Sequence, residues 1–82
     1  ILSDEIYNKL ILNGQHHISI ASLDKELPIV TFNGLSKCYL APGFRIGWSI
    51  VSGAPELVKD YTEAMKKLVR ARLCTSHPKQ FA

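Results

Sequence analysis

A lysine and an arginine, Lys37 and Arg45, stand out in this sequence because their types and spacing could do chemistry together. Lys37 follows an apolar, β-branched segment, and Arg45 lies between two glycines at the opening of the next apolar segment. A lysine amine in a partly desolvated pocket near another cation loses its proton more readily and becomes nucleophilic. An arginine fork binds phosphate through two parallel hydrogen bonds. The pair is therefore suited to hold a phosphorylated carbonyl compound, with the lysine forming a Schiff base.

The histidine, cysteine and glycine motifs of the chain give little support for a metal or nucleotide site. His16 and His17 are adjacent, so in an extended segment they point to opposite faces and share a metal poorly. Cys74 and His77 have a spacing that supplies only half of a metal-ligand set. No P-loop or dinucleotide-binding glycine motif is present. We therefore predict no metal ligand in this chain.

A group of cations on one expected helix has two interpretations. It could bind an acidic partner such as a nucleic acid, or it could be a solvated helix face whose cations lie near the C-terminus, where the helix dipole favours them. We favour the solvated face. The cations are Lys59, Lys66, Lys67, Arg70 and Arg72.

The elements that must position Lys37 and Arg45 follow from the apolar pattern. Residues 28–32 and 44–51 are β-branched and aromatic, which is typical of buried strands. Asn-Gly and Ser-Gly pairs end these two segments, and such pairs mark turns. Residues 1–2 form an apolar stub that could be the end of another strand.

Helical periodicity is clearest in the second half of the chain. Apolar residues recur at helical spacing from Pro55 to about residue 73, and proline is favoured at the first position of a helix. Residues 4–12 indicate a short helix or a turn, residues 15–25 a loop, and Pro78 the start of a further helix. This order is typical of a piece of an α/β or α+β layer.

Length and composition set limits on the class of protein. The chain has 82 residues, 46% hydrophobic and 21% charged, with a formal net charge of +3. These values fit at most one globular domain and lack the dense cation clusters of a nucleic-acid binder. Two cysteines without a paired spacing suit a reducing compartment, so we expect a cytoplasmic location. The apolar start and the expected helix start at the end suggest a piece of a larger protein.

Two motifs resemble those of a known family. The run Ser-Lys-x-x-x-x-Pro-Gly-x-Arg-x-Gly-Trp over residues 36–48 resembles the pyridoxal-phosphate lysine motif of class I and II aminotransferases, the fold-type I enzymes. Upstream, Ser-Asp-Glu-Ile-Tyr over residues 3–7 resembles the segment that places an aspartate under the pyridine nitrogen of the cofactor. The sequences of residues 32–37 and 72–74 are most similar to the alanine-aminotransferase-like subgroup. The resemblance to the family covers essentially the whole chain.

The resemblance implies a role for each matching residue. Lys37 would form the Schiff base with pyridoxal phosphate and shuttle the proton of the substrate α-carbon. Asp4 would pair with the protonated pyridine nitrogen, although an aspartate here could also cap a short helix. Tyr7 would donate a hydrogen bond to the phenolic oxygen of the cofactor, and Arg45 would bind its phosphate. Ser36 would bind the phosphate or orient the loop.

One position departs from the family pattern. Many relatives carry a serine three residues before the lysine, whereas this chain has Gly34 there. The departure removes one side-chain contact to the phosphate. The two motif glycines around Arg45, Gly43 and Gly47, are expected to allow a close backbone approach or a positive φ.

The resemblance also implies a fold and an activity. Residues 1–82 would be part of the large, cofactor-binding domain, an α/β fragment with a mainly parallel sheet flanked by helices, and the isolated piece would be inactive. The complete enzyme would be a cytoplasmic homodimer that transfers an amino group between an amino acid, alanine first, and a 2-oxo acid, with no nucleic-acid or membrane partner. Three alternatives stay open. They are a C–S β-lyase, an enzyme like aminocyclopropane-carboxylate synthase, and a non-catalytic fragment that binds an acidic partner through its basic helix.

Overall fold

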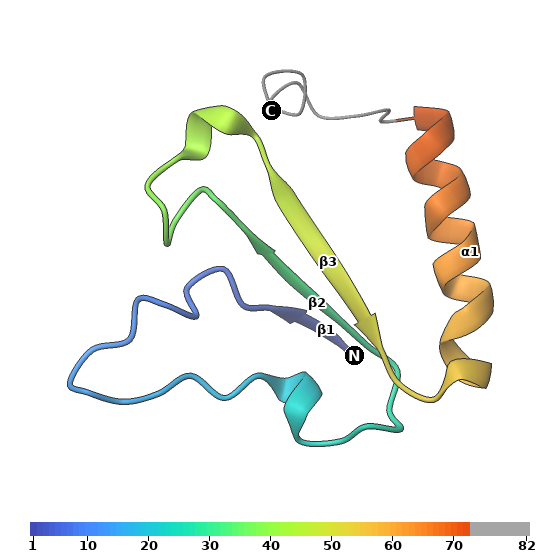
Figure 1. Ribbon diagram of the computed structural model, residues 1–82, viewed down its shortest axis with the longest axis horizontal. Coiled ribbons are helices and arrows are strands. Elements are labelled where there is room, and N and C mark those ends of the chain that lie inside the picture. Colours follow the sequence, from blue (N-terminus) through green and yellow to red (C-terminus); the bar gives the residue numbers. More distant parts are fainter. Residues whose placement is uncertain (73–82) are drawn as a thin grey trace.

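Three strands form one small sheet. The computed structural model describes residues 1–72, and in it β1 (Leu2–Asp4), β2 (Ile29–Gly34) and β3 (Gly47–Ser52) lie in the order β1-β2-β3 (Figure 1). β1 pairs with β2 in parallel, and β2 pairs with β3 antiparallel. The α/β fold is confirmed, with a mixed rather than mainly parallel sheet over these residues. The antiparallel pairing follows from the connection between β2 and β3, because it lacks the crossover helix that parallel strands usually need.

The strands start later than the sequence pattern predicted. β2 begins after Pro28 and continues through the Asn33-Gly34 pair, because these two residues still pair with Trp48 and Gly47 of β3. Residues 44–46 do not belong to β3. A short 3₁₀ helix, η2 (Pro42–Phe44), ends at Phe44 and is followed by Arg45 in the left-handed conformation, with φ of 52°.

The long helix is confirmed and stands beside β3 (Figure 1). α1 (Pro55–Arg72) begins at a proline, as predicted. A cavity of about 250 Å³ separates its first turns from the sheet, with Val30, Val51, Leu57 and Tyr61 in the lining. Its five cations are exposed, and one of them, Lys66, pairs with the exposed Glu63 at 3.1 Å. Within residues 1–72, no helix combines the length and the apolar character that a membrane span requires.

The segment between β1 and β2 holds turns instead of an α-helix. Residues 6–9 form a turn, which is one of the two outcomes expected for residues 4–12, and the expected loop contains a short 3₁₀ helix, η1 (Ile20–Ser22). The helix start expected at Pro78, like Cys74 and His77, lies outside the described residues.

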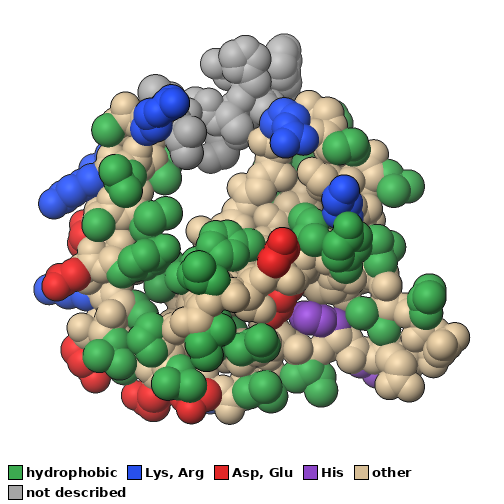
Figure 2. All heavy atoms as spheres, turned by 180° about the vertical axis from the view of Figure 1, so that it is seen from behind, with side chains coloured by type: hydrophobic (Ala, Val, Ile, Leu, Met, Phe, Trp, Pro, Cys, Tyr) green, Lys and Arg blue, Asp and Glu red, His purple; other side chains and the backbone are tan. Residues whose placement is uncertain are grey.

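Little apolar surface is buried within the described residues. The buried hydrophobic residues are Ile29, Val30 and Ala54, whereas many large apolar side chains on the strands and on α1 are exposed. Figure 2 shows hydrophobic side chains gathered along the flank of α1 that faces the sheet and over the sheet itself, with a hollow between them. Such a sheet needs further cover to be stable in water.

Candidate active site

The two sequence motifs meet where the parallel strands β1 and β2 end. Asp4 is the register partner of Phe32, so both side chains project from the same face of the sheet. Beside them lies a cavity of about 350 Å³. Its lining contains four of the five predicted site residues together with three neighbours. The lining residues are Asp4, Ile6, Tyr7, Phe32, Asn33, Ser36 and Lys37.

Asp4 caps the turn that carries Tyr7. Its Oδ1 accepts a hydrogen bond from the backbone N–H of Ile6 at 3.2 Å. The predicted capping role therefore exists, although the cap serves a turn and not a helix. The same carboxylate lines the cavity, so one group can hold the turn and face a ligand. Tyr7 also lines the cavity and is 57% exposed.

The thiol of Cys38 connects the loop that carries Lys37, here called the lysine loop, to this turn. Sγ of Cys38, the residue after Lys37, donates a hydrogen bond to the backbone oxygen of Ile6 at 3.0 Å. It also lies 3.6 Å from Oδ1 of Asn8. Cys38 is a half-buried free cysteine. No role had been predicted for it, because nothing in the local sequence pattern showed that residues 6 and 38 would lie side by side.

Arg45 lies outside the cavity lining. Its guanidinium Nη1 donates to the backbone oxygen of Pro42 at 2.9 Å, and its side chain is exposed. The left-handed φ belongs to Arg45 itself, whereas neither Gly43 nor Gly47 has a positive φ. Gly47 does make a close approach, since a Cβ there would lie 3.3 Å from the oxygen of Asn33. A Cβ at Gly43 would meet nothing within 4 Å, so the expectation that Gly43 allows a close approach or a positive φ was wrong. The phosphate role of Arg45 stays a prediction.

Gly34 has a steric reason for lacking a side chain. A Cβ at this position would lie 2.8 Å from the backbone oxygen of Ile46 and 3.4 Å from Cδ1 of Ile6. The first distance is shorter than real Cβ atoms show, and the obstacle is main chain. Leu35 donates to the same Ile46 oxygen at 3.1 Å, which fixes that oxygen in place. The serine of many relatives would therefore not fit here without a backbone shift.

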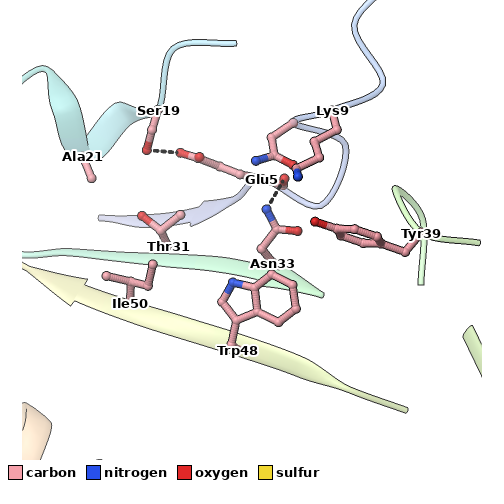
Figure 3. Close-up of a pocket in the computed structure, with 10 residues that line it drawn as sticks. Glu5, Lys9, Ser19, Ala21, Thr31, Asn33, Tyr39, Trp48 and Ile50 are labelled. Atoms are coloured by element: carbon pink, nitrogen blue, oxygen red, sulfur yellow. Dashed lines mark hydrogen bonds between the residues drawn. The ribbon is translucent and has the colours of Figure 1, made fainter. Parts of the chain in front are cut away.

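A buried carboxylate lies directly behind Asp4. Glu5 is 8% exposed, and its Oε1 accepts a hydrogen bond from the hydroxyl of Ser19 at 2.8 Å (Figure 3). The same oxygen accepts from the N–H of Ile20 at 3.2 Å. Oγ of Ser3 lies 3.2 Å from the same oxygen, and Nε2 of His17 lies 2.8 Å from Oε2. Burial raises the pKa of Glu5, but these hydrogen bonds together outweigh burial and hold the pKa below its ordinary value.

Glu5 was not predicted from the sequence as a functional residue. Its partners His17, Ser19 and Ile20 belong to a stretch without periodicity, which gave no signal of where it packs. The only local signal was the position of Glu5 between Asp4 and Tyr7.

A second cavity of about 390 Å³ opens on the opposite face of the sheet (Figure 3). Thr31, Trp48 and Ile50 form its floor, and Glu5 lies at its side. Tyr39 lines this cavity and not the one beside Lys37. The ammonium of Lys9 lies 5.1 Å from the centre of the Tyr39 ring. The phenol raises the pKa of Lys9, first as a hydrogen-bond partner and then through its charge.

The described residues also bear on metal binding. Residues 1–72 contain no group of three or more histidines, cysteines or carboxylates placed to hold a metal ion. One of the adjacent histidines, His17, is instead a partner of Glu5.

Known proteins resemble this chain over its whole length. A family model described as aminotransferase class I and II matches residues 1–82. The glutamate-pyruvate aminotransferase AlaA of Escherichia coli K12 is 44% identical over 82 residues, which is 100% of this chain and 20% of that protein. The alanine aminotransferase of Mycobacterium tuberculosis H37Rv is 40% identical over 82 residues, 100% of this chain and 19% of its own length.

Solved structures give the same result for the fold. A crystal structure of an aminotransferase from Escherichia coli matches with a TM-score of 0.85 and 43% identity, covering 96% of this chain and 20% of its own. The alanine aminotransferase from Pyrococcus furiosus matches with a TM-score of 0.82 and 41% identity, covering 98% and 20%. The chain thus spans about a fifth of the length of these relatives. On the match of its entire sequence and of its fold, the chain belongs to the class I and II aminotransferase family.

Proposed function

We propose that this chain is part of a pyridoxal-phosphate-dependent aminotransferase that moves an amino group between an amino acid and a 2-oxo acid. The observation that carries the proposal is the cavity in which Asp4, Tyr7, Ser36 and Lys37 meet from two distant parts of the sequence. Alanine is the first candidate for the amino acid, because relatives at 40–45% identity are named alanine or glutamate-pyruvate aminotransferases.

The residues around the cavity fit this cofactor. Its volume of about 350 Å³ lies within the range of roughly 300–1,000 Å³ typical of small-molecule sites. The carboxylate of Asp4 suits a cationic ring nitrogen, and the amine of Lys37 suits an aldehyde carbon. The hydroxyl of Ser36 can donate to a phosphate oxygen. The lining therefore offers a partner of the right charge or reactivity for three different parts of one molecule.

Each residue then has a defined task. When bound, the pyridoxal ring supplies an electron sink for the substrate α-carbon. Asp4 would keep the proton on the ring nitrogen through its negative charge. Lys37 would hold the cofactor through Nζ, and its free amine would move the proton of the substrate α-carbon. The hydroxyl of Tyr7 would donate a hydrogen bond to the phenolic oxygen.

Two further features belong to the same proposal. Arg45 would bind the phosphate after its side chain leaves the oxygen of Pro42, which is possible because that contact is exposed. The complete enzyme would be a cytoplasmic homodimer. The free thiol of Cys38 is compatible with a reducing compartment, and the large exposed apolar surface supports cover by further chain or a second subunit.

An amino-transfer assay tests the proposal. The complete protein, loaded with pyridoxal phosphate, should convert alanine and 2-oxoglutarate into pyruvate and glutamate. Lys37→Ala should abolish this activity, whereas Lys66→Ala, which changes an exposed lysine on α1, should leave it unchanged. Release of ammonia and a thiol from a cysteine conjugate, with no amino transfer to any 2-oxo acid, would instead assign the β-lyase activity. Equal activity of the two variants would overturn the role of Lys37.

A further inference from the structure

We propose that Glu5 is a positioning residue that holds Asp4 and Tyr7 in their places at the cavity. This inference rests on the proposed function, because Asp4 and Tyr7 act on the cofactor only if that function holds. Asp4 and Glu5 are neighbours at the end of β1, and successive side chains of an extended segment point to opposite faces. Asp4 lines the cavity that contains Lys37, and Glu5 lines the cavity on the other face.

The main chain of Glu5 is fixed on both sides. Its N–H donates to the oxygen of Phe32 at 2.9 Å, which continues the pairing of β1 with β2. Its carbonyl oxygen accepts from Nδ2 of Asn33 at 3.1 Å (Figure 3) and from the N–H of Asn8 at 3.0 Å. The second of these bonds closes the turn that contains Tyr7. Glu5 is therefore the fixed point from which the turn begins.

The side chain of Glu5 is also held in place, by four hydrogen-bond partners. Oε1 is held by Ser3, Ser19 and the N–H of Ile20, and Oε2 by His17. A buried carboxylate keeps its place only while such partners remain, because an unpaired buried charge is costly. The carboxylate thus ties the end of β1 to a loop that is 12 to 15 residues away in sequence.

These contacts set the orientation of the two cavity residues. A rotation of the chain at Glu5 would pull its carboxylate away from this set of donors and would turn Asp4 in the opposite sense, away from the cavity. The same rotation would move the oxygen that holds Asn8, and with it Tyr7. Glu5 does not line the cavity beside Lys37, so it acts on the reaction through Asp4 and Tyr7.

The test uses three variants of the complete protein. Glu5→Ala removes every side-chain contact, and Glu5→Gln keeps one acceptor oxygen for Ser3, Ser19 and Ile20. Glu63→Gln is the matched control, since it removes a paired carboxylate that is exposed on α1. Two readouts do not depend on turnover. They are hydrogen exchange of residues 4–10 in the cofactor-free protein and the visible absorbance band of the bound cofactor.

Glu5→Ala should speed exchange of the turn amides, including that of Asn8, while α1 exchanges as in the unchanged protein. It should also shift the cofactor band and lower kcat on the order of 10- to 100-fold with KM changed less, as expected for misplaced catalytic groups. Glu5→Gln should recover part of each change. A purely structural role would move the exchange of many elements and would leave the band of the folded holoenzyme in place.

The outcomes separate the two proposals. If the unchanged protein shows neither a cofactor band nor amino transfer, the proposed function fails, and the positioning role fails with it even if exchange of the turn responds. If the unchanged protein is active but both Glu5 variants match Glu63→Gln in exchange, band and kcat, the positioning role is overturned. Should Glu5→Ala not fold, Ser19→Ala removes a single donor and must still change exchange and band in the same direction, or the inference is wrong.

Discussion

The thiol of Cys38 and the backbone oxygen of Ile6 lie 3.0 Å apart and connect the two halves of the candidate site. Cys38 follows the lysine that defines one motif, and Ile6 lies between the aspartate and the tyrosine of the other. The hydrogen bond is one direct side-chain link between the loop that carries Lys37 and the turn of residues 6–9.

Replacement of Cys38 should show what this link contributes. Cys38→Ala should lower the free energy of unfolding of the complete protein by about 0.5–1.5 kcal/mol, the usual net value of one hydrogen bond. Cys38→Ser keeps a donor of similar size and should lose less. Urea unfolding of the two variants measures the difference. Equal stability of the alanine and serine variants would show that the hydrogen bond of Cys38 contributes nothing to the stability of the protein.

Gly34 should not accept the serine found at this position in many relatives. A Cβ would meet the oxygen of Ile46 at 2.8 Å, so Gly34→Ser should destabilise the complete protein by about 1–3 kcal/mol, as forced packing does. Gly43→Ser is the matched control, because a Cβ at Gly43 meets nothing within 4 Å. Thermal unfolding of both variants tests this, and a Gly34→Ser protein as stable as the control would contradict the steric account.

Asp4 has two tasks that a single substitution can separate. Asp4→Asn keeps an oxygen for the N–H of Ile6 but removes the negative charge that faces the cavity. Stability should therefore stay close to that of the unchanged protein, while kcat should fall on the order of 10²- to 10³-fold, as when one electrostatic contact to the reacting centre is lost. Asp4→Ala should lose activity and stability together. An active Asp4→Asn enzyme would leave the aspartate with the capping role alone.

Acid should weaken the contacts of Glu5 before it unfolds the rest of the protein. Because the folded-state pKa of Glu5 lies below its ordinary value of 4.5, its ionised form contributes stability that is fully present above that value. This contribution is lost as the pH falls through the lowered folded-state pKa. The ionisable groups around it are His17, which contacts it, and Lys9 and Tyr39, which line the same cavity.

Hydrogen exchange of residues 4–10 between pH 6 and pH 3 follows this loss. Rates corrected for the intrinsic effect of pH on exchange should rise below pH 4.5 in the unchanged protein. They should depend less on pH in Glu5→Gln, which has no carboxylate to protonate. A pH dependence that is the same in both proteins would assign the acid sensitivity to other groups.

The elements of the fold were predictable where the local pattern is strong. β2 and α1 follow from a β-branched run and from a helical apolar stripe that begins at Pro55, and both patterns are properties of neighbouring residues. The pattern did not reveal that Arg45 takes a left-handed conformation after a 3₁₀ turn, because nothing local distinguishes residues 44–46 from the strand that follows.

The candidate site was predictable only through its motifs. Residue type and spacing suggested Lys37 and Arg45, and the family motif added Asp4, Tyr7 and Ser36. The sequence did not reveal Glu5 and Cys38, because their side-chain partners, apart from Ser3, are 12 or more residues away in sequence. Long-range hydrogen bonds of single polar side chains leave no period in the sequence.

Chemical trapping of the cofactor tests the central claim most directly. The complete protein, loaded with pyridoxal phosphate and reduced with borohydride, is digested and its peptides are mapped by mass spectrometry. The account predicts a pyridoxyl group on Nζ of Lys37 and no such group after Lys37→Ala. A pyridoxyl group on another lysine, or on none, would contradict it.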